Sequence, residues 1–109
     1  MWSRTVKTAV IVTAGLWSGA ALAIEPCHHG VPDISLIEGS SSPPGRLAPD
    51  AETLHPNGKL QEHRWHNLHV AQRPLTLVCR YANKEAPVVL PETIDTCVMD
   101  YDERRVHCF

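Results

Sequence analysis

The sequence predicts a small, mainly β domain: an antiparallel sheet or a curled half-barrel with two disulfides and room for one short helix. Three observations lead to this expectation. Short segments rich in strand-forming residues recur along the chain, turn residues separate them, and the 109 residues include four cysteines. Strands that repeat at this spacing favour antiparallel pairing.

The first 23 residues are typical of a secretory signal peptide. Arg4 and Lys7 precede an uncharged apolar run, and Ala21-Leu22-Ala23 forms a small-residue cleavage site. A retained membrane anchor is the alternative, but the run of about 15 residues is shorter than the ~20 that a spanning helix needs. Cleavage after Ala23 leaves residues 24–109 as one extracytoplasmic domain, either periplasmic or secreted.

Charge and size narrow the classes of partner and the means of stabilisation. Loss of Arg4 and Lys7 leaves eight of the ten basic residues against twelve acidic ones. Nucleic acids and anionic membranes attract a basic surface, so we expect no nucleic-acid partner and no membrane contact after signal cleavage. Removal of the 23 signal residues from the 109-residue chain leaves a small domain. Burial of apolar surface alone seldom stabilises a domain of this size, so crosslinks are expected.

The first half of the domain contains one clear strand. Residues 34–37 are apolar and follow the turn signal Pro32-Asp33, whereas residues 40–45 read Ser-Ser-Ser-Pro-Pro-Gly and predict a surface loop. Residues 50–54 are ambiguous and are compatible with one helical turn. Asn57-Gly58 then predicts a tight turn.

The second half is richer in strand formers. Residues 75–81 are the clearest strand, because alternation places one apolar set on a single face: Leu75, Leu77, Cys79 and Tyr81. A hairpin connection at 83–85 leads to a strand at 87–90. Two further strands, 96–101 and 104–109, are joined through Asp102-Glu103.

Residues 59–72 have two interpretations. Trp65 and Val70 favour a strand over 64–70, next to the clear strand that follows. A helix is the alternative, because Trp65, Leu68 and Ala71 recur every three residues among good helix formers. We favour the strand, and the mainly β class holds in either case.

All four cysteines follow the signal, in a compartment where disulfides persist: Cys27, Cys79, Cys97 and Cys108. With Asp102-Glu103 as a two-residue turn, Cys97 lies directly opposite Cys108, close enough for a disulfide. Cys27 then remains for Cys79. Two other pairings stay open at this point. A bridged cysteine cannot act as a nucleophile, and the chain has no Cys-x-x-Cys redox pair.

All seven histidines also follow the signal: His28, His29, His55, His63, His66, His69 and His107. Because imidazole is a common metal ligand, a zinc- or copper-binding protein is an alternative function, with His63, His66 and His69 as candidate ligands. On a strand, His63 and His69 would lie on the order of 20 Å apart. Solvated surface histidines are therefore the favoured interpretation, and no cofactor is expected.

The sequence contains no recognisable catalytic motif. It lacks a Gly-x-Ser-x-Gly elbow, a His-Glu-x-x-His helix and a glycine-rich phosphate loop. The carboxylates between residues 95 and 103 are typical of a solvated turn. We expect that the chain is not an enzyme, and a small hydrolase is the least favoured alternative.

Several short motifs resemble a group of small exported bacterial proteins of uncharacterised function, which have four cysteines and a Cys-x-Tyr strand. The motifs are Trp65-His66-Asn67-Leu68, Leu77-Val78-Cys79-Arg80-Tyr81 and Val89-Leu90-Pro91, with Cys97 and Cys108 after them. The resemblance implies a periplasmic or secreted location. It implies no established activity. Export, small size, crosslinking and the absence of catalytic motifs favour a protein-binding module whose partner is an envelope or extracellular protein.

Overall fold

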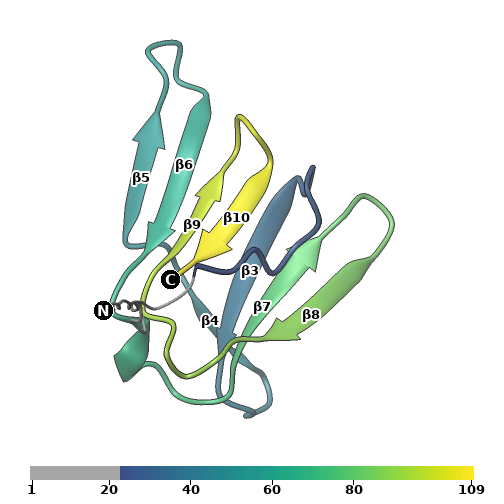
Figure 1. The fold of residues 1–109 in the computed structure, drawn as a ribbon, viewed down its shortest axis with the longest axis vertical. Coiled ribbons are helices and arrows are strands. Elements are labelled where there is room, and N and C mark those ends of the chain that lie inside the picture. The colour runs from purple at the N-terminus through teal and green to yellow at the C-terminus, as the bar shows by residue number, and fades with distance from the viewer. Residues whose placement is uncertain (1–22) are drawn as a thin grey trace, which may run out of the picture.

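The computed structural model describes residues 23–109, so the predicted signal peptide lies outside the described residues except for Ala23. Two four-stranded antiparallel sheets make up the domain (Figure 1). The predicted class, mainly β and antiparallel with two disulfides, is confirmed. No helix within residues 23–109 is long and apolar enough to cross a membrane.

The first sheet has the order β10-β9-β6-β5 and the second has the order β4-β3-β7-β8. The first sheet consists of β5 (Ala51–Leu54), β6 (Leu60–Trp65), β9 (Cys97–Asp100) and β10 (Arg105–Cys108). The second consists of β3 (Asp33–Glu38), β4 (Gly45–Leu47), β7 (Leu75–Arg80) and β8 (Glu85–Val89). One turn of 3-10 helix, η1 (Leu68–Val70), follows β6.

The core lies between the inner faces of the two sheets. Its largest fully buried side chains come from both sheets and from the segment before β3: Val31, Leu36, Leu75, Leu77, Met99 and Val106. The alternation predicted for residues 75–81 is confirmed, since Leu75, Leu77 and Cys79 are all buried. Apolar residues at every second position therefore form one continuous core.

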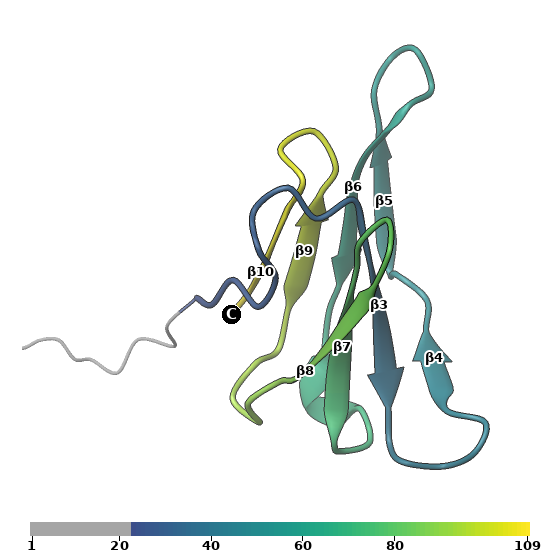
Figure 2. The same cartoon turned by 90° about the vertical axis from the view of Figure 1, so that its right-hand side faces the viewer.

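The ambiguous segment at residues 50–54 contains a strand, Ala51–Leu54, and the helical turn considered there does not form. Ala51–Leu54 pairs with β6 across the Asn57-Gly58 turn, whose glycine has a φ of 88°. A segment this short does not form a stable helix by itself. Its hydrogen-bonded pairing with β6 stabilises the extended conformation instead. Figure 2 shows β4 running into β5, so the chain crosses between the sheets through residues 48–50.

Residues 64–70 were predicted to form a strand, but the strand ends at Trp65. The prediction for residues 66–70 is wrong. Asn67 has a left-handed φ of 55°, which breaks the extended backbone, and η1 begins at the next residue. The helical alternative for 59–72 is also wrong, because Leu60–Trp65 is a strand. Gly45, placed in the predicted loop, begins β4 instead.

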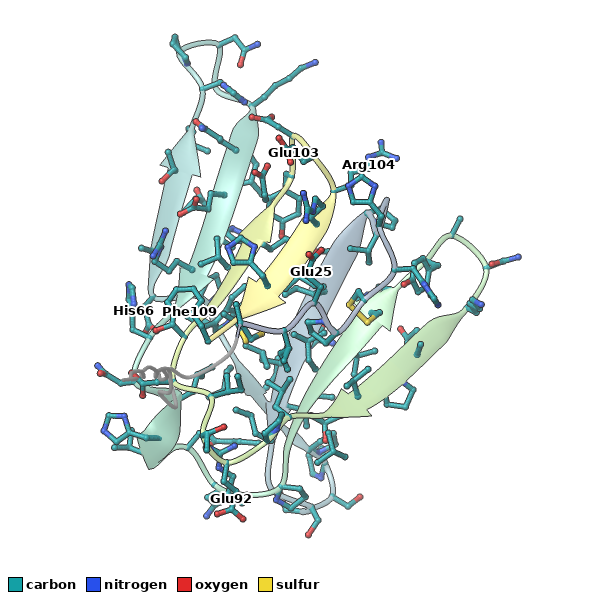
Figure 3. The ribbon with its side chains drawn as sticks, in the orientation of Figure 1. Glu25, His66, Glu92, Glu103, Arg104 and Phe109 are labelled. Carbon is teal, nitrogen blue, oxygen red and sulfur yellow. A yellow bond between two sulfur atoms is a disulfide. The ribbon has the colours of Figure 1, made fainter. Side chains whose placement is uncertain are left out.

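The last hairpin has the predicted register. Cys97 pairs with Cys108, and Asp100 pairs with Arg105. The Asp100 carboxylate accepts hydrogen bonds from the backbone N–H groups of Asp102 and Glu103, at 2.9 and 3.1 Å, and so stabilises the turn. Glu103 and Arg104 lie at the hairpin tip (Figure 3).

Both predicted disulfides, Cys27–Cys79 and Cys97–Cys108, are present. Thr96 and Phe109 exchange two backbone hydrogen bonds, so the neighbouring pair Cys97–Cys108 occupies a non-hydrogen-bonded position, where opposed side chains are closest. Cys27–Cys79 attaches the segment before β3 to β7. All four sulfurs are buried with their residues in the core.

The outer strands differ in how accessible their edges are. Ile24 exchanges two backbone hydrogen bonds with Cys108 and covers the end of β10. Leu90 donates its N–H to Leu75, so by alternation Pro87 of β8 faces away from β7 and offers no N–H at that edge. All four residues of β5 are exposed.

The two disulfides should contribute unequally to stability. They join residues 52 and 11 positions apart, and the chain-entropy model assigns about 4 kcal/mol to the longer loop and about 3 kcal/mol to the shorter one. We expect the Cys27→Ala/Cys79→Ala variant to lose more free energy of unfolding than Cys97→Ala/Cys108→Ala. Urea denaturation of both double variants checks this order, and the reverse order would contradict it.

Candidate functional site

Two clefts lie side by side between the sheets and share a wall of Leu47, Ala48 and Trp65. The β3 cleft, of about 450 Å³, is lined also by residues 33–35, Arg46, Pro49, His63 and Arg80. The η1 cleft, of about 370 Å³, is lined also by Glu38, Asp50, residues 66–68, Val70 and Ala71. The chain that crosses from β4 to β5 separates the two.

Trp65 holds this separating segment in place. Its side chain is only 3% exposed and its indole Nε1–H donates a hydrogen bond to the Leu47 carbonyl at 3.1 Å. The neighbouring His66 N–H donates to the Asp50 carboxylate at 2.6 Å. Both ends of the crossing segment are thus bonded to the end of β6.

Four polar side chains form a continuous chain at the β3 cleft, which we call the inter-sheet network: Asp33, Glu52, His63 and Tyr101. The Tyr101 hydroxyl donates to the Asp33 carboxylate at 3.0 Å and lies 2.9 Å from His63 Nδ1. His63 Nε2 lies 2.9 Å from the Glu52 carboxylate. Asp33 belongs to the second sheet and the other three to the first, so the network joins the sheets.

Strand register explains why these residues meet. Glu52 pairs with His63 across β5 and β6, and His63 pairs with Met99 across β6 and β9. Tyr101, two residues after Met99, therefore points to the same face, and its N–H donates to the Gln61 carbonyl. The His63 and Tyr101 rings meet edge to face, 5.2 Å between centroids.

Burial and the nearby carboxylates of Asp33 and Glu52 raise the pKa of Tyr101 well above its ordinary value. A phenolate there would lose hydration and be repelled by two negative charges. Tyr101 therefore keeps its proton at neutral pH and acts as a hydrogen-bond donor.

Two arginines give the β3 cleft positive charge. Arg80 donates to the Ser35 hydroxyl at 3.4 Å and lies 3.5 Å from the Glu85 carboxylate. Arg46 also lines the cleft and is exposed, and within residues 23–109 its guanidinium makes no hydrogen bond or ion pair. The N–H donors of this side chain are therefore available to a ligand.

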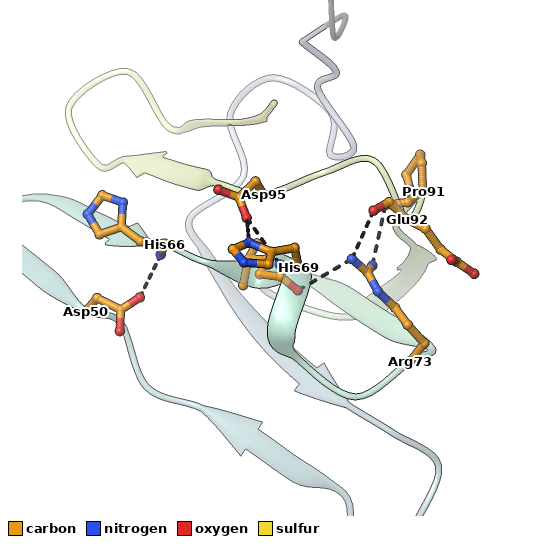
Figure 4. A network of polar contacts seen from close by, with 8 residues as sticks. Asp50, His66, His69, Arg73, Pro91, Glu92 and Asp95 are labelled. Carbon is orange, nitrogen blue, oxygen red and sulfur yellow. Dashed lines mark hydrogen bonds and ion pairs between the residues drawn. The ribbon is translucent and has the colours of Figure 1, made fainter.

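The wall of the η1 cleft is positioned by Asp95 and Arg73 (Figure 4). Asp95 accepts from the Leu68 N–H through its carbonyl and from the His69 N–H and ring through its carboxylate. Arg73 donates to the carbonyls of Leu68 and Glu92, at 3.4 and 3.2 Å. The turn after β6 is thereby bonded to the segment between β8 and β9.

The hydrogen bonds from His69 hold the pKa of Asp95 below its usual range. The charge of His66 has a smaller effect in the same direction. Arg105 similarly lowers the pKa of Glu25, which lies beside β10 (Figure 3), through a hydrogen bond and an ion pair at 2.8 Å. Because carboxylates with lowered pKa values stabilise the fold above their unfolded pKa, this stabilisation is lost as the pH falls.

The structure does not assemble the three candidate metal ligands. His63 contacts Glu52 and Tyr101, His69 contacts Asp95, and His66 is bonded through its backbone to Asp50. Within residues 23–109, no group of three or more His, Cys, Asp or Glu residues is placed to hold a metal ion. His55 contacts a fourth carboxylate, Asp102, at 2.7 Å.

Asp33, Glu52, Arg46 and Tyr101 were not singled out as site residues from the sequence. Asp33 reads as part of a turn and Glu52 as part of an ambiguous segment. Their meeting depends on pairings between strands far apart in the chain, and Asp33 and Tyr101 are 68 positions apart. The alternation of β6 places His63 on the face of Trp65, and that is the one signal available in advance.

Comparison with family models, with curated proteins and with solved structures gave no match for this chain. The site is therefore interpreted from its own geometry.

The Tyr101→Phe variant should lose about 2 kcal/mol of stability, because it removes the partner of the Asp33 carboxylate and of His63 Nδ1. Tyr81→Phe is the matched control, since its hydroxyl accepts one hydrogen bond from the exposed His28 N–H and should cost about 1 kcal/mol or less. Urea denaturation measures both. Equal losses would show that the inter-sheet network adds no stability of its own.

Replacement of His69 by alanine should raise the pKa of Asp95, because the largest cause of its lowering disappears. A titration of the Asp95 carboxyl carbon by NMR measures the change. His66→Ala serves as the control and should shift the same pKa by less. An unchanged Asp95 titration in His69→Ala would show that the contact does not persist in solution.

Proposed function

We propose that this chain is an exported, disulfide-bonded binding module that holds a carboxylate-bearing segment of an envelope or extracellular protein in the β3 cleft. The observation that carries the proposal is an open cleft that combines the apolar Ile34 and Trp65, the unpaired Arg46 and an uncovered stretch of strand edge. Disulfides in both sheets fit an oxidising compartment outside the cytoplasm.

The first half of β3 has an edge that β4 leaves uncovered. β4 pairs only with Leu36–Glu38, whereas β7 pairs with the whole of β3. Gly39 donates its N–H to Pro74 on the β7 side, so by alternation Glu38, Leu36 and Ile34 face the β4 side. The N–H and C=O of Ile34 are then available to an extended segment laid beside β3.

Charge favours an acidic ligand group at this position. Arg46 is exposed beside the cleft, and a guanidinium matches a carboxylate with two parallel hydrogen bonds. The carboxylate of Asp33 lies on the same cleft but accepts the Tyr101 hydroxyl. A side-chain or C-terminal carboxylate of the partner would therefore meet Arg46 without an unsatisfied acid next to it.

The same geometry favours binding over catalysis. Both ring nitrogens of His63 face partners within the protein, so neither is free to act as a base toward a ligand. Ser35, the hydroxyl on the cleft, is 8% exposed and accepts from Arg80. A metal-binding role is not proposed, because the candidate histidines contact separate carboxylates.

An Ala48→Phe variant tests the proposal. Ala48 is exposed and lines both clefts, so a phenylalanine there fills the binding space without entering the core. Ala82→Phe, at the exposed turn between β7 and β8, is the matched control. After capture of a partner from envelope extract by the wild-type protein, we expect Ala48→Phe to bind at least about tenfold more weakly and Ala82→Phe to bind normally.

Arg46→Ala should also weaken binding, and the loss should shrink at high salt because an exposed ion pair is screened. Unchanged affinity in both Ala48→Phe and Arg46→Ala would exclude the β3 cleft as the binding surface. Failure to capture any saturable partner would contradict the proposal as a whole.

A further inference from the structure

The hydrogen bonds of the inter-sheet network can be counted against the protons available to make them. The network contains three contacts in series: Asp33 to Tyr101, Tyr101 to His63, and His63 to Glu52. Each contact needs one proton between its two heavy atoms. Ionised Asp33 and Glu52 only accept, and the hydroxyl of Tyr101 supplies one proton.

The remaining two protons must come from His63. A neutral imidazole carries one and an imidazolium carries two, so all three contacts form together only when His63 is protonated on both nitrogens. When His63 is neutral, its one proton is best placed on Nε2, facing the Glu52 carboxylate. Nδ1 is then an acceptor and competes with Asp33 for the Tyr101 hydroxyl.

We propose that protonation of His63 controls the contact between the two sheets at the β3 cleft. With His63 protonated, Tyr101 donates to Asp33 and the sheets are joined. With His63 neutral, Tyr101 donates to His63 and Asp33 becomes a free carboxylate on the cleft. Histidine is the side chain that most readily gains or loses a proton near neutral pH, so His63 is the member of the network whose proton count can change.

Polar groups from five neighbouring segments surround His63. Glu52 of β5 and Tyr101 after β9 contact the ring directly, and Asp33 of β3 is bonded to Tyr101. Arg46 of β4 and Arg80 of β7 line the same cleft, and Arg80 also lies near Glu85. The His63 side chain is only 18% exposed, so water compensates little for a contact that is lost.

This inference rests on the proposed function and names its regulation. Asp33 is ionised in both states, but without the Tyr101 hydrogen bond and the positive charge on His63 it would repel more strongly the acidic ligand group that Arg46 attracts. The partner would therefore be held at low pH and released as the pH rises. The proton count itself involves no partner and can be tested without one.

Nitrogen NMR of the His63 ring in the exported, oxidised protein tests the count directly. When both ring nitrogens carry protons, at the acid end of the titration, we expect the Tyr101 hydroxyl proton to be bonded to Asp33. When one proton remains, at the alkaline end, we expect it on Nε2 and the Tyr101 hydroxyl bonded to Nδ1. An Asp33–Tyr101 bond that persists beside a singly protonated ring, or a Tyr101–Nδ1 bond donated by the hydroxyl beside a doubly protonated one, would overturn the inference.

The pH dependence of unfolding gives a second readout. All three contacts form only with a doubly protonated ring, so the network should respond to pH in the wild-type protein and not in His63→Gln. His107→Gln is the matched control and should keep the wild-type profile; identical profiles for wild type and His63→Gln would contradict the control by His63.

The two tests separate this inference from the proposed function. Loss of partner binding in Ala48→Phe together with a His63 ring that never takes a second proton would retain the cleft and exclude its regulation. A normal proton count without any partner at the cleft would retain the network and exclude the binding role. Should His63→Gln fail to fold, the ring protonation of the wild-type protein still decides the matter.

Discussion

The Cys27–Cys79 disulfide is the constraint on which the position of the second sheet depends. It bonds the segment before β3 to β7, the strand that pairs with β3 along its whole length. Val31, between Cys27 and β3, is fully buried. The start of β3 is therefore fixed on both sides, and it is there that Asp33 meets Tyr101 and the β3 cleft begins. Because a domain of this size buries little surface, the crosslink is an important constraint on the start of β3.

The inner face of the first sheet changes character along its strands, and this change produces the site. On β6 the inward positions run from the buried Trp65 to His63, and on β9 they run from Cys97 and Met99 to Tyr101. Where the apolar residues end, polar side chains still point inward. Half-buried polar groups need partners, and the inter-sheet network supplies them by joining β5, β6 and β9 to β3. The site is thus the polar continuation of the core.

Much of the fold, but little of the site, could be predicted from the sequence. The strands around 34–37 and 75–81, the Asn57-Gly58 turn and the Cys97–Cys108 disulfide follow from alternation, turn chemistry and a register that can be counted. Cys27–Cys79 was then the remaining pair. The division into two sheets could not be derived, because it depends on β4, which has three residues, and on the crossing at residues 48–50. The inter-sheet network depends on that crossing and was therefore out of reach as well.

The unequal protection of the outer strands has a consequence for the behaviour of the protein at high concentration. Pro87 and the Ile24–Cys108 bonds limit what can add to β8 and β10, whereas all four residues of β5 are exposed and Leu54 is 51% exposed. Of the two outer strands of the first sheet, β5 thus offers the more exposed edge for pairing with another chain. A negative charge at Glu52 and the bulge beside Leu54 are the features that oppose such pairing, so crowded or overexpressed material relies on them to remain monodisperse.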